Sequence, residues 1–170
     1  MISIRSMTEA DWPQVAQIYQ EGITTGIATF ETAVPAYEKW NAVHAKSCRL
    51  VSISDGTVLD GAVSGWAALS PVSSRRVYSG VAEVSVYVGG NYRGQHIGQI
   101  LLDALIKESE KEGYWTLQST ILEENTVSIA LHHKCGFRTV GFRERAARDK
   151  NGTWHNTLLL ERRSAVVGLE

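Results

Sequence analysis

The feature that most constrains this chain is a change of hydrophobic period within residues 81–106. In the first part, Val84, Val86 and Val88 alternate with polar or aromatic residues, which predicts one face of a β-strand. Two glycines then break the strand, and from Ile97 the apolar residues recur with the spacing of a helix. The sequence therefore predicts a strand, a turn and a helix at the centre of the fold.

Residues 93–98, Arg-Gly-Gln-His-Ile-Gly, form the expected turn before that helix. The first turn of a helix exposes unpaired N–H groups and a partial positive charge, which suit phosphate oxygens. Gly94 and Gly98 let a bulky anion approach the backbone, and Arg93 adds a positive charge. A pyrophosphate cradle and an ordinary strand-to-helix turn both remain open at this point. The turn has neither the Gly-Lys-Ser/Thr of a P-loop nor the three glycines of a dinucleotide fingerprint.

Composition argues against several classes of protein. A chain of 170 residues fits one domain, which we expect to span residues 1–163, followed by a loosely held tail at residues 164–170. A net charge of −1 leaves no basic surface for nucleic acid or an anionic membrane. Cys48 and Cys135 are too few for a disulfide framework and are expected to be reduced thiols. No stretch resembles a leader or a membrane span, so we expect a cytoplasmic protein.

The rest of the chain alternates between strand-like and helix-like patterns. Thr8 is expected to cap the first helix, with Asp11 three residues later. A stretch without a clear period at residues 22–35 predicts a long ordered loop, and such loops are often functional. The other expected elements are strands at residues 2–5, 50–53, 58–69, 116–121, 137–142 and 157–160, helices at 36–46 and after Asn125, and turns at Asp55-Gly56 and 150–152. Together they predict an α/β (α+β) domain.

Several segments now coincide with one family. Residues 124–137, ENTVSIALHHKCGF, resemble the late helix of the GNAT N-acetyltransferase superfamily. Arg93 and Gly98 match the ends of its acyl-CoA loop, while His96 stands where a glycine is usual. Three further segments resemble the phosphinothricin and methionine sulfone/sulfoximine N-acetyltransferase group. They are TTGIATFET at 24–32, Arg-Arg-Val-Tyr at 75–78 and AEVSVYV at 82–88. This resemblance covers nearly the whole chain. It implies a GNAT fold with a mixed sheet of six to seven strands, splayed at the central strand and flanked by about four helices.

The resemblance implies acetyl-CoA as co-substrate. It also implies which residues contact each part of acetyl-CoA. The implied contacts are Val86, Tyr87 and Val88 for pantetheine, Arg93, Gly94, Gln95, His96, Ile97, Gly98 and Gln99 for pyrophosphate, and Asn125 and Ser128 for the arm. Only the backbone is assigned this role at Val86 and Val88, whose side chains are expected in the core. Asn125 is expected both to cap its helix and to contact the cofactor. A solvated serine remains the alternative for Ser128.

The implied chemistry is transfer of the acetyl group to a primary amine, which must first lose a proton. Glu83 is the candidate base, because a carboxylate among valines is costly to bury without a function. Its alternative is a structural ion pair with Arg75 or Arg76. His132 stands where the family often has tyrosine, which points to a proton donor for the departing thiolate or to a packed histidine without a proton role.

The group resemblance also implies an acidic amino-acid substrate, since arginine grips carboxylate or phosphinate groups bidentately. The expected substrate-binding residues are Phe30, Arg75, Arg76, Tyr78 and Glu83. For Arg76 a solvated position is the preferred interpretation. We expect a small-molecule amine as acceptor, no metal, no nucleic acid, no membrane and, by analogy, a homodimer. Two competing hypotheses are another acceptor, such as an aminoglycoside or a protein N-terminus, and an acyl-CoA-binding sensor without turnover.

Overall fold

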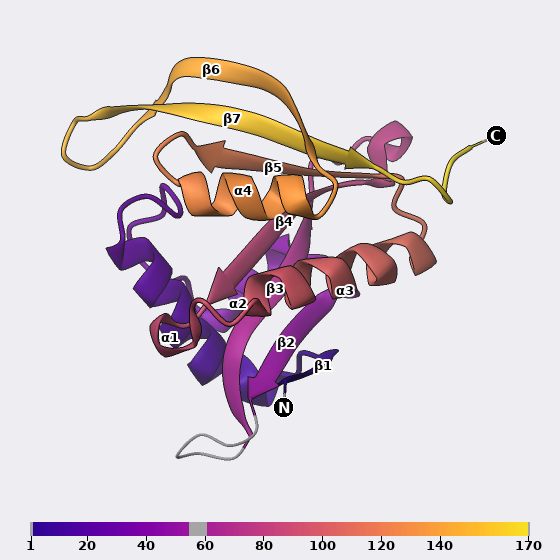
Figure 1. The fold of residues 1–170 in the computed structure, drawn as a ribbon, viewed down its shortest axis with the longest axis horizontal. Coiled ribbons are helices and arrows are strands. Elements are labelled where there is room, and N and C mark those ends of the chain that lie inside the picture. Colours follow the sequence, from indigo (N-terminus) through magenta and orange to yellow (C-terminus); the bar gives the residue numbers. More distant parts are fainter. Residues whose placement is uncertain (1, 55–60, 170) are drawn as a thin grey trace.

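The structure is a computed structural model that describes residues 2–54 and 61–169, so the predicted Asp55-Gly56 turn lies outside the described residues. Within them, seven strands form one mixed sheet with helices on both faces (Figure 1). The strands are β1 (Ile2–Ser6), β2 (Arg49–Ser54), β3 (Ala62–Pro71), β4 (Val81–Val88), β5 (Thr116–Leu122), β6 (Arg138–Arg148) and β7 (Trp154–Arg163). The helices are α1 (Trp12–Thr24), α2 (Tyr37–Val43), α3 (Ile97–Lys111) and α4 (Thr126–Lys134), with 3₁₀ turns at Glu9–Asp11, Arg76–Tyr78 and Gly90–Tyr92. The predicted mixed α/β fold is confirmed.

The sheet is splayed at its centre, as predicted. Its order is β1-β2-β3-β4-β5-β7-β6, and the contact between β4 and β5 is parallel while the other neighbours are antiparallel. These two strands pair only from Val81–Glu83 to Thr116–Gln118 and then part. Beyond Glu83, the edges of β4 and β5 that face each other therefore carry backbone groups without a strand partner, and such groups can bind a side chain or another molecule.

The two faces of β4 enter different cores, which confirms the predicted alternation. Val84, Val86 and Val88 pack with α3 on one face of the sheet. Tyr87 joins the opposite core beneath α1 and α2, where its ring stacks on Trp66 with the centroids 4.7 Å apart. Burying each large apolar side chain stabilises the fold by about 1.5–3 kcal/mol, so a shift of one residue in β4 would disrupt both cores.

Four elements have bounds that differ from the prediction. Helix α1 continues to Thr24, into the stretch expected to be a loop. Helix α2 ends at Val43, because His44 adopts an extended backbone and Ala45 N then donates to Leu69 O. Strands β6 and β7 are longer than predicted, since their outer parts are exposed and rich in charged residues, which hides the two-residue period.

The prediction of a loosely held tail is wrong for residues 164–168. Ser164 N donates to Trp115 O at 2.8 Å, and Ser164 Oγ donates to Glu110 Oε1 at 2.9 Å. The Arg163 side chain donates to the carbonyls of Trp115, Val167 and Gly168. Side-chain bonds of this kind have no sequence period, so the pattern of apolar residues does not reveal them.

Both cysteines are free and buried. Burial raises the pKa of the Cys48 thiol to about 11 and that of Cys135 to about 12, so both stay protonated near neutrality. Neither lines the cleft described below. Among the described residues, no helix has the length and apolar character needed to cross a membrane.

Candidate active site

A cleft of about 680 Å³ opens where β4 and β5 part. It is lined along its length by Glu83–Val88 of β4 and Ser119–Leu122 of β5. We call one end the helix half, lined by the start of α3 and by α4, and the other the loop half, lined by Gly22, Thr25 and Ile27–Phe30. Glu83 lines this cleft at the point where the two strands begin to part.

The helix half presents unpaired backbone donors. The first hydrogen bond into helix α3 runs from Ile100 N to His96 O at 3.1 Å, so the N–H groups of residues 97–99 have no partner inside the helix. Arg93 and Lys134 line the same end and add positive charge. This combination suits a diphosphate, because anions are stabilised by a helix N-terminus and by nearby cations.

The turn before α3 adopts a left-handed backbone at two positions. Gly94 has φ 75° and His96 has φ 61°. Glycine takes this conformation freely, whereas a side chain there costs roughly 1–2 kcal/mol. The histidine therefore occupies a position that favours glycine, while its backbone keeps the course that the turn requires.

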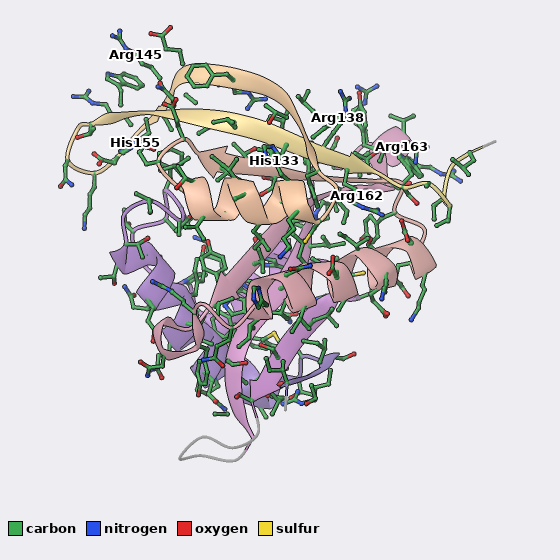
Figure 2. The ribbon with its side chains drawn as sticks, viewed as in Figure 1. His133, Arg138, Arg145, His155, Arg162 and Arg163 are labelled. Atoms are coloured by element: carbon green, nitrogen blue, oxygen red, sulfur yellow. The ribbon has the colours of Figure 1, made fainter. Side chains whose placement is uncertain are left out.

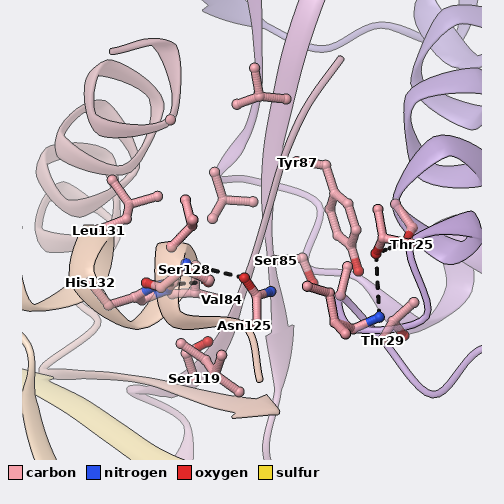
Figure 3. Close-up of a pocket in the computed structure, with 18 of the residues that line it drawn as sticks. Thr25, Thr29, Val84, Ser85, Tyr87, Ser119, Asn125, Ser128, Leu131 and His132 are labelled. Carbon is pink, nitrogen blue, oxygen red and sulfur yellow. Dashed lines mark hydrogen bonds between the residues drawn. The ribbon is translucent and has the colours of Figure 1, made fainter. Parts of the chain in front are cut away.

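Gly98 lies in the first turn of α3, close to α4. A Cβ at this position would lie 3.1 Å from Leu131 Cδ2, so the leucine side chain would have to shift by a few tenths of an ångström. Asn125 caps α4, and its Oδ1 accepts a hydrogen bond from Ser128 N at 3.2 Å (Figure 3). The predicted cap is confirmed, and Asn125 and Ser128 both line the cleft.

His132 lies against the cleft with only 1% of its surface exposed. Its Nδ1 is 2.8 Å from Ser128 O, and because a carbonyl only accepts, Nδ1 carries the proton (Figure 3). Burial lowers the pKa of His132, so the ring is neutral near neutrality. Nε2 is therefore a buried acceptor, and it has no hydrogen-bond partner among the described residues.

Glu83 is fixed by two hydrogen bonds from β5. Thr120 N donates to Oε1 at 2.8 Å, and Gln118 Nε2 donates to Oε2 at 2.7 Å. The alternative of a structural ion pair with Arg75 or Arg76 is wrong: neither contact occurs among the described residues. The carboxylate is half-buried, lines the cleft, and keeps acceptor positions beyond the two that are used.

The loop half combines apolar and hydroxyl groups. Figure 3 shows the Tyr87 hydroxyl pointing toward Thr25 and Thr29 of the loop after α1. Burial raises the pKa of Tyr87, so the phenol stays protonated. A Cβ on Gly22 would lie 2.7 Å from the Tyr87 ring, so α1 approaches this ring only because the residue has no side chain.

Most of the predicted site residues meet in this cleft. Those that line it are Phe30, Glu83, Val86, Tyr87, Val88, Arg93, Gly94, His96, Ile97, Gly98, Gln99, Asn125, Ser128 and His132. Gln95 is not among the lining residues, and neither are Arg75, Arg76 and Tyr78. The Arg75 guanidinium instead lies over the Tyr78 ring, 5.6 Å from its centroid. Substrate binding by this arginine loop stays a prediction.

The sequence analysis missed several lining residues: Gly22, Thr25, Thr29, Ser85, Ser119, Thr120 and Lys134. Thr25 and Thr29 belong to the segment that carries the group resemblance, which was a usable signal. Ser119 and Thr120 face the cleft only because β5 parts from β4, and no local pattern in the sequence reports that.

Comparison with known proteins gives consistent similarities. The model of the acetyltransferase (GNAT) family matches residues 12–137. A phosphinothricin N-acetyltransferase of Alcaligenes faecalis is 31% identical over 172 residues, covering 94% of this chain and 81% of that protein. An L-methionine sulfoximine/L-methionine sulfone acetyltransferase of Pseudomonas paraeruginosa is 30% identical over 140 residues, covering 82% of this chain and 81% of that protein.

A solved structure extends the similarity to the fold. It is a GNAT superfamily phosphinothricin acetyltransferase from Sinorhizobium meliloti in complex with AcCoA, with a TM-score of 0.87 and 25% identity. The similarity covers 99% of this chain and 91% of that chain. The resemblance first noted in the sequence is confirmed. The chain belongs to the GNAT acetyltransferase family, in its phosphinothricin and methionine sulfoximine acetyltransferase group, and is an acetyl-CoA-dependent acyltransferase.

Proposed function

We propose that the protein acetylates the primary amine of a small amino acid or analogue of the phosphinothricin and methionine sulfoximine/sulfone type, by direct transfer. The observation that carries this proposal is the position of Glu83. Its carboxylate lines the cleft where β4 and β5 begin to part, and the same cleft is lined by a helix half suited to a diphosphate and by a loop half of apolar and hydroxyl groups. The names of the two relatives, at about 30% identity, support this acceptor class.

Glu83 binds the incoming ammonium group and accepts its proton, directly or through a water molecule. The bonds from Thr120 N and Gln118 Nε2 hold both carboxylate oxygens, so the remaining lone pairs keep a fixed direction. Loss of the proton gives the amine a lone pair, which forms the new N–C bond as the C–S bond of the thioester breaks. The acetylated nitrogen then loses its second proton and the thiolate takes up one, so the products are the amide, the free thiol and the one proton first removed from the ammonium group.

Acetyl-CoA, when bound, supplies the activated acetyl thioester. The residues of the helix half fit it: unpaired amides at residues 97–99 with Arg93 and Lys134 for the diphosphate, and the free edge of β4 for the extended arm. Asn125 and Ser128 add polar groups along the same path. The role proposed for these residues is to bind and orient acetyl-CoA.

His132 lines the cleft with its Nδ1 proton on Ser128 O, and its neutral Nε2 is a buried acceptor. In this resting state it accepts a hydrogen bond or a proton, and it would donate only after taking a proton up. We therefore propose that it receives a proton during turnover and passes it to the departing thiolate, instead of starting as an acid. Burial has the largest effect and lowers the pKa of His132, while the negative charge of Glu83 acts in the opposite sense with a smaller effect.

We also propose that the protein is a homodimer. Strand β6 ends the sheet, so one of its edges has no strand partner among the described residues. Val140, Phe142 and Trp154 are exposed on this hairpin, with 44%, 53% and 55% of their surface accessible. A second chain would bury them. Analytical ultracentrifugation measures this directly, and a monomer at every concentration would contradict it.

An acceptor panel tests the proposed function. Thiol release from acetyl-CoA would be measured with phosphinothricin, methionine sulfoximine and methionine sulfone, beside an aminoglycoside and a peptide N-terminus. We expect the highest kcat/KM with the amino-acid analogues. Preference for a cationic acceptor or the peptide would reject this substrate class. Binding of acetyl-CoA by calorimetry without turnover of any amine would favour a sensor and reject the enzyme proposal.

A further inference from the structure

A charged cluster lies at the start of β7, next to Phe30 of the loop half. His155, at the start of β7, is labelled in Figure 2 and lies between two carboxylates from other segments. Its Nδ1 is 2.9 Å from Glu124 Oε1, in the connection between β5 and α4. Its Nε2 is 3.2 Å from Asp149 Oδ2, in the turn between β6 and β7. We call these three residues the clasp.

The clasp holds a doubly protonated ring. Carboxylates only accept hydrogen bonds, so both ring nitrogens must donate, which requires the imidazolium form. The hydrogen bond to Asp149 and then that to Glu124 raise the pKa of His155, which favours this form. Asp149 is itself fixed, because its Oδ1 accepts from the N–H groups of Asn151 and Thr153, each at 2.9 Å.

Phe30 connects the clasp to the cleft, because its ring contacts His155 and also lines the loop half. The Phe30 and His155 rings meet edge to face, with centroids 5.9 Å apart and planes at 67°. Phe30 lines the loop half, whereas His155 does not line the cleft. The irregular loop after α1 has few regular backbone bonds of its own, so a side-chain contact from β7 has a large influence on where the Phe30 ring lies.

We propose that His155 is a positioning residue for the acylation reaction, which holds Phe30 against the loop half and thereby sets the affinity for the amine. This inference rests on the proposed function only in taking an amine as the ligand of the loop half. Glu124 and Asp149 are the charged groups that face the ring, and Phe30 faces it from the loop. His155 acts through Phe30 and touches neither substrate.

The clasp has a defined response to pH. Because its pKa is raised in the folded protein, the imidazolium persists below that value and loses a proton as the pH rises through it. A neutral ring has one N–H, so one carboxylate bond is lost and the ring is free to turn. Phe30 then loses its fixed neighbour, and the KM for the amine rises with pH.

Steady-state kinetics of His155→Ala and His155→Gln test the role in amine binding. Alanine removes the ring and both donors, whereas glutamine keeps N–H donors but does not titrate. Both variants should fold, because Asn156 and Glu123 hold the hairpin to the β5–α4 connection through backbone and side-chain bonds. We expect His155→Ala to raise the KM for the amine about tenfold and that for acetyl-CoA less than about twofold.

The matched control is His133→Ala, which removes an exposed histidine on α4 that does not line the cleft. It should leave both KM values and the pH profile unchanged. In His155→Gln, we expect the KM for the amine to lose the rise that accompanies deprotonation of the histidine in the wild type. Equal changes in both KM values, or an unchanged pH profile in His155→Gln, would overturn the proposal.

A readout without turnover uses fluorinated phenylalanine. The chain has three phenylalanines, and Phe30→Leu identifies the resonance of Phe30. In the wild type, this resonance should titrate with a midpoint above the usual histidine pKa of about 6.5, and in His155→Gln it should be flat. A flat wild-type resonance would overturn the clasp even in an active enzyme. A clear titration in a protein that acetylates no amine would reject the proposed function and leave the clasp standing.

Discussion

The helix half and the loop half of the cleft are built in different ways. The helix half comes from regular elements in two short stretches of chain, β4 with α3 and the start of α4. The loop half comes from the last turns of α1 and the irregular residues after it, which contact Tyr87 of β4 and His155 near the other end of the chain. A helix N-terminus suited to an anion therefore needs only local backbone geometry, whereas the loop half depends on contacts between distant parts of the chain.

Glu83→Gln removes the proposed base, which lines the cleft where β4 and β5 part, and should have the largest effect. Glutamine keeps an oxygen for Thr120 N and a similar volume, so the fold should be retained. The carboxylate that binds ammonium and accepts the proton is lost, and we expect kcat/KM for the amine to fall about 100-fold or more. Thiol release at neutral pH measures this, with acetyl-CoA affinity by calorimetry as the control.

If Glu83→Gln kept near wild-type turnover, the carboxylate would have no part in proton transfer. If it lost acetyl-CoA binding as well, Glu83 would belong to the helix half and the division of the cleft would be wrong. Loss of amine turnover with unchanged acetyl-CoA affinity would support the division of the cleft into two halves.

His132→Gln tests the proton role of the buried histidine. The wild-type ring must start neutral, and burial lowers its pKa, so kcat should fall as the pH drops through a value below about 6.5. Glutamine does not titrate, so the variant should lose this acidic limb and about tenfold in kcat. The measurement is kcat against pH for both proteins. A wild-type kcat that instead falls as the pH rises through a histidine pKa would show that His132 starts as an acid.

The two halves of the cleft also differ in how much of each can be predicted from the sequence. The helix half is predictable because its period changes from strand to helix within 81–106 and its turn carries a recognisable motif. Glu83 is predictable as a polar residue among valines. The Phe30 loop has no period, and its contact with His155 joins residues from opposite ends of the chain. Ser119 becomes a lining residue only where β4 and β5 part, which is a tertiary feature.

Gly22→Ala probes the loop half through its packing. The new methyl group would meet the Tyr87 ring at 2.7 Å, and that ring has little room because it stacks on Trp66. Displacing it should cost about 1–3 kcal/mol in stability and raise the KM for the amine about tenfold, with the KM for acetyl-CoA nearly unchanged. Urea denaturation and steady-state kinetics measure the two effects.

Gly141→Ala is the matched control for this change, because a Cβ there meets nothing within 4 Å. It should alter stability by less than about 0.5 kcal/mol. If Gly22→Ala raised the KM for acetyl-CoA as much as that for the amine, the two halves would not be separable through Tyr87.

His96→Gly should have the smallest effect and tests whether the helix half acts through its backbone. His96 has φ 61°, a conformation that costs a side chain roughly 1–2 kcal/mol, while glycine makes the unfolded chain more flexible by about 0.5–1 kcal/mol. We expect a net gain of about 0.5 kcal/mol in the free energy of unfolding and less than a threefold change in acetyl-CoA affinity, since the amide is retained. Urea denaturation and calorimetry measure these quantities. Gly94→Ala, at φ 75°, should shift stability the other way by about 1 kcal/mol. A large loss of acetyl-CoA affinity in His96→Gly would mean that the imidazole itself binds the diphosphate, and the helix half would then depend on a side chain as the loop half does.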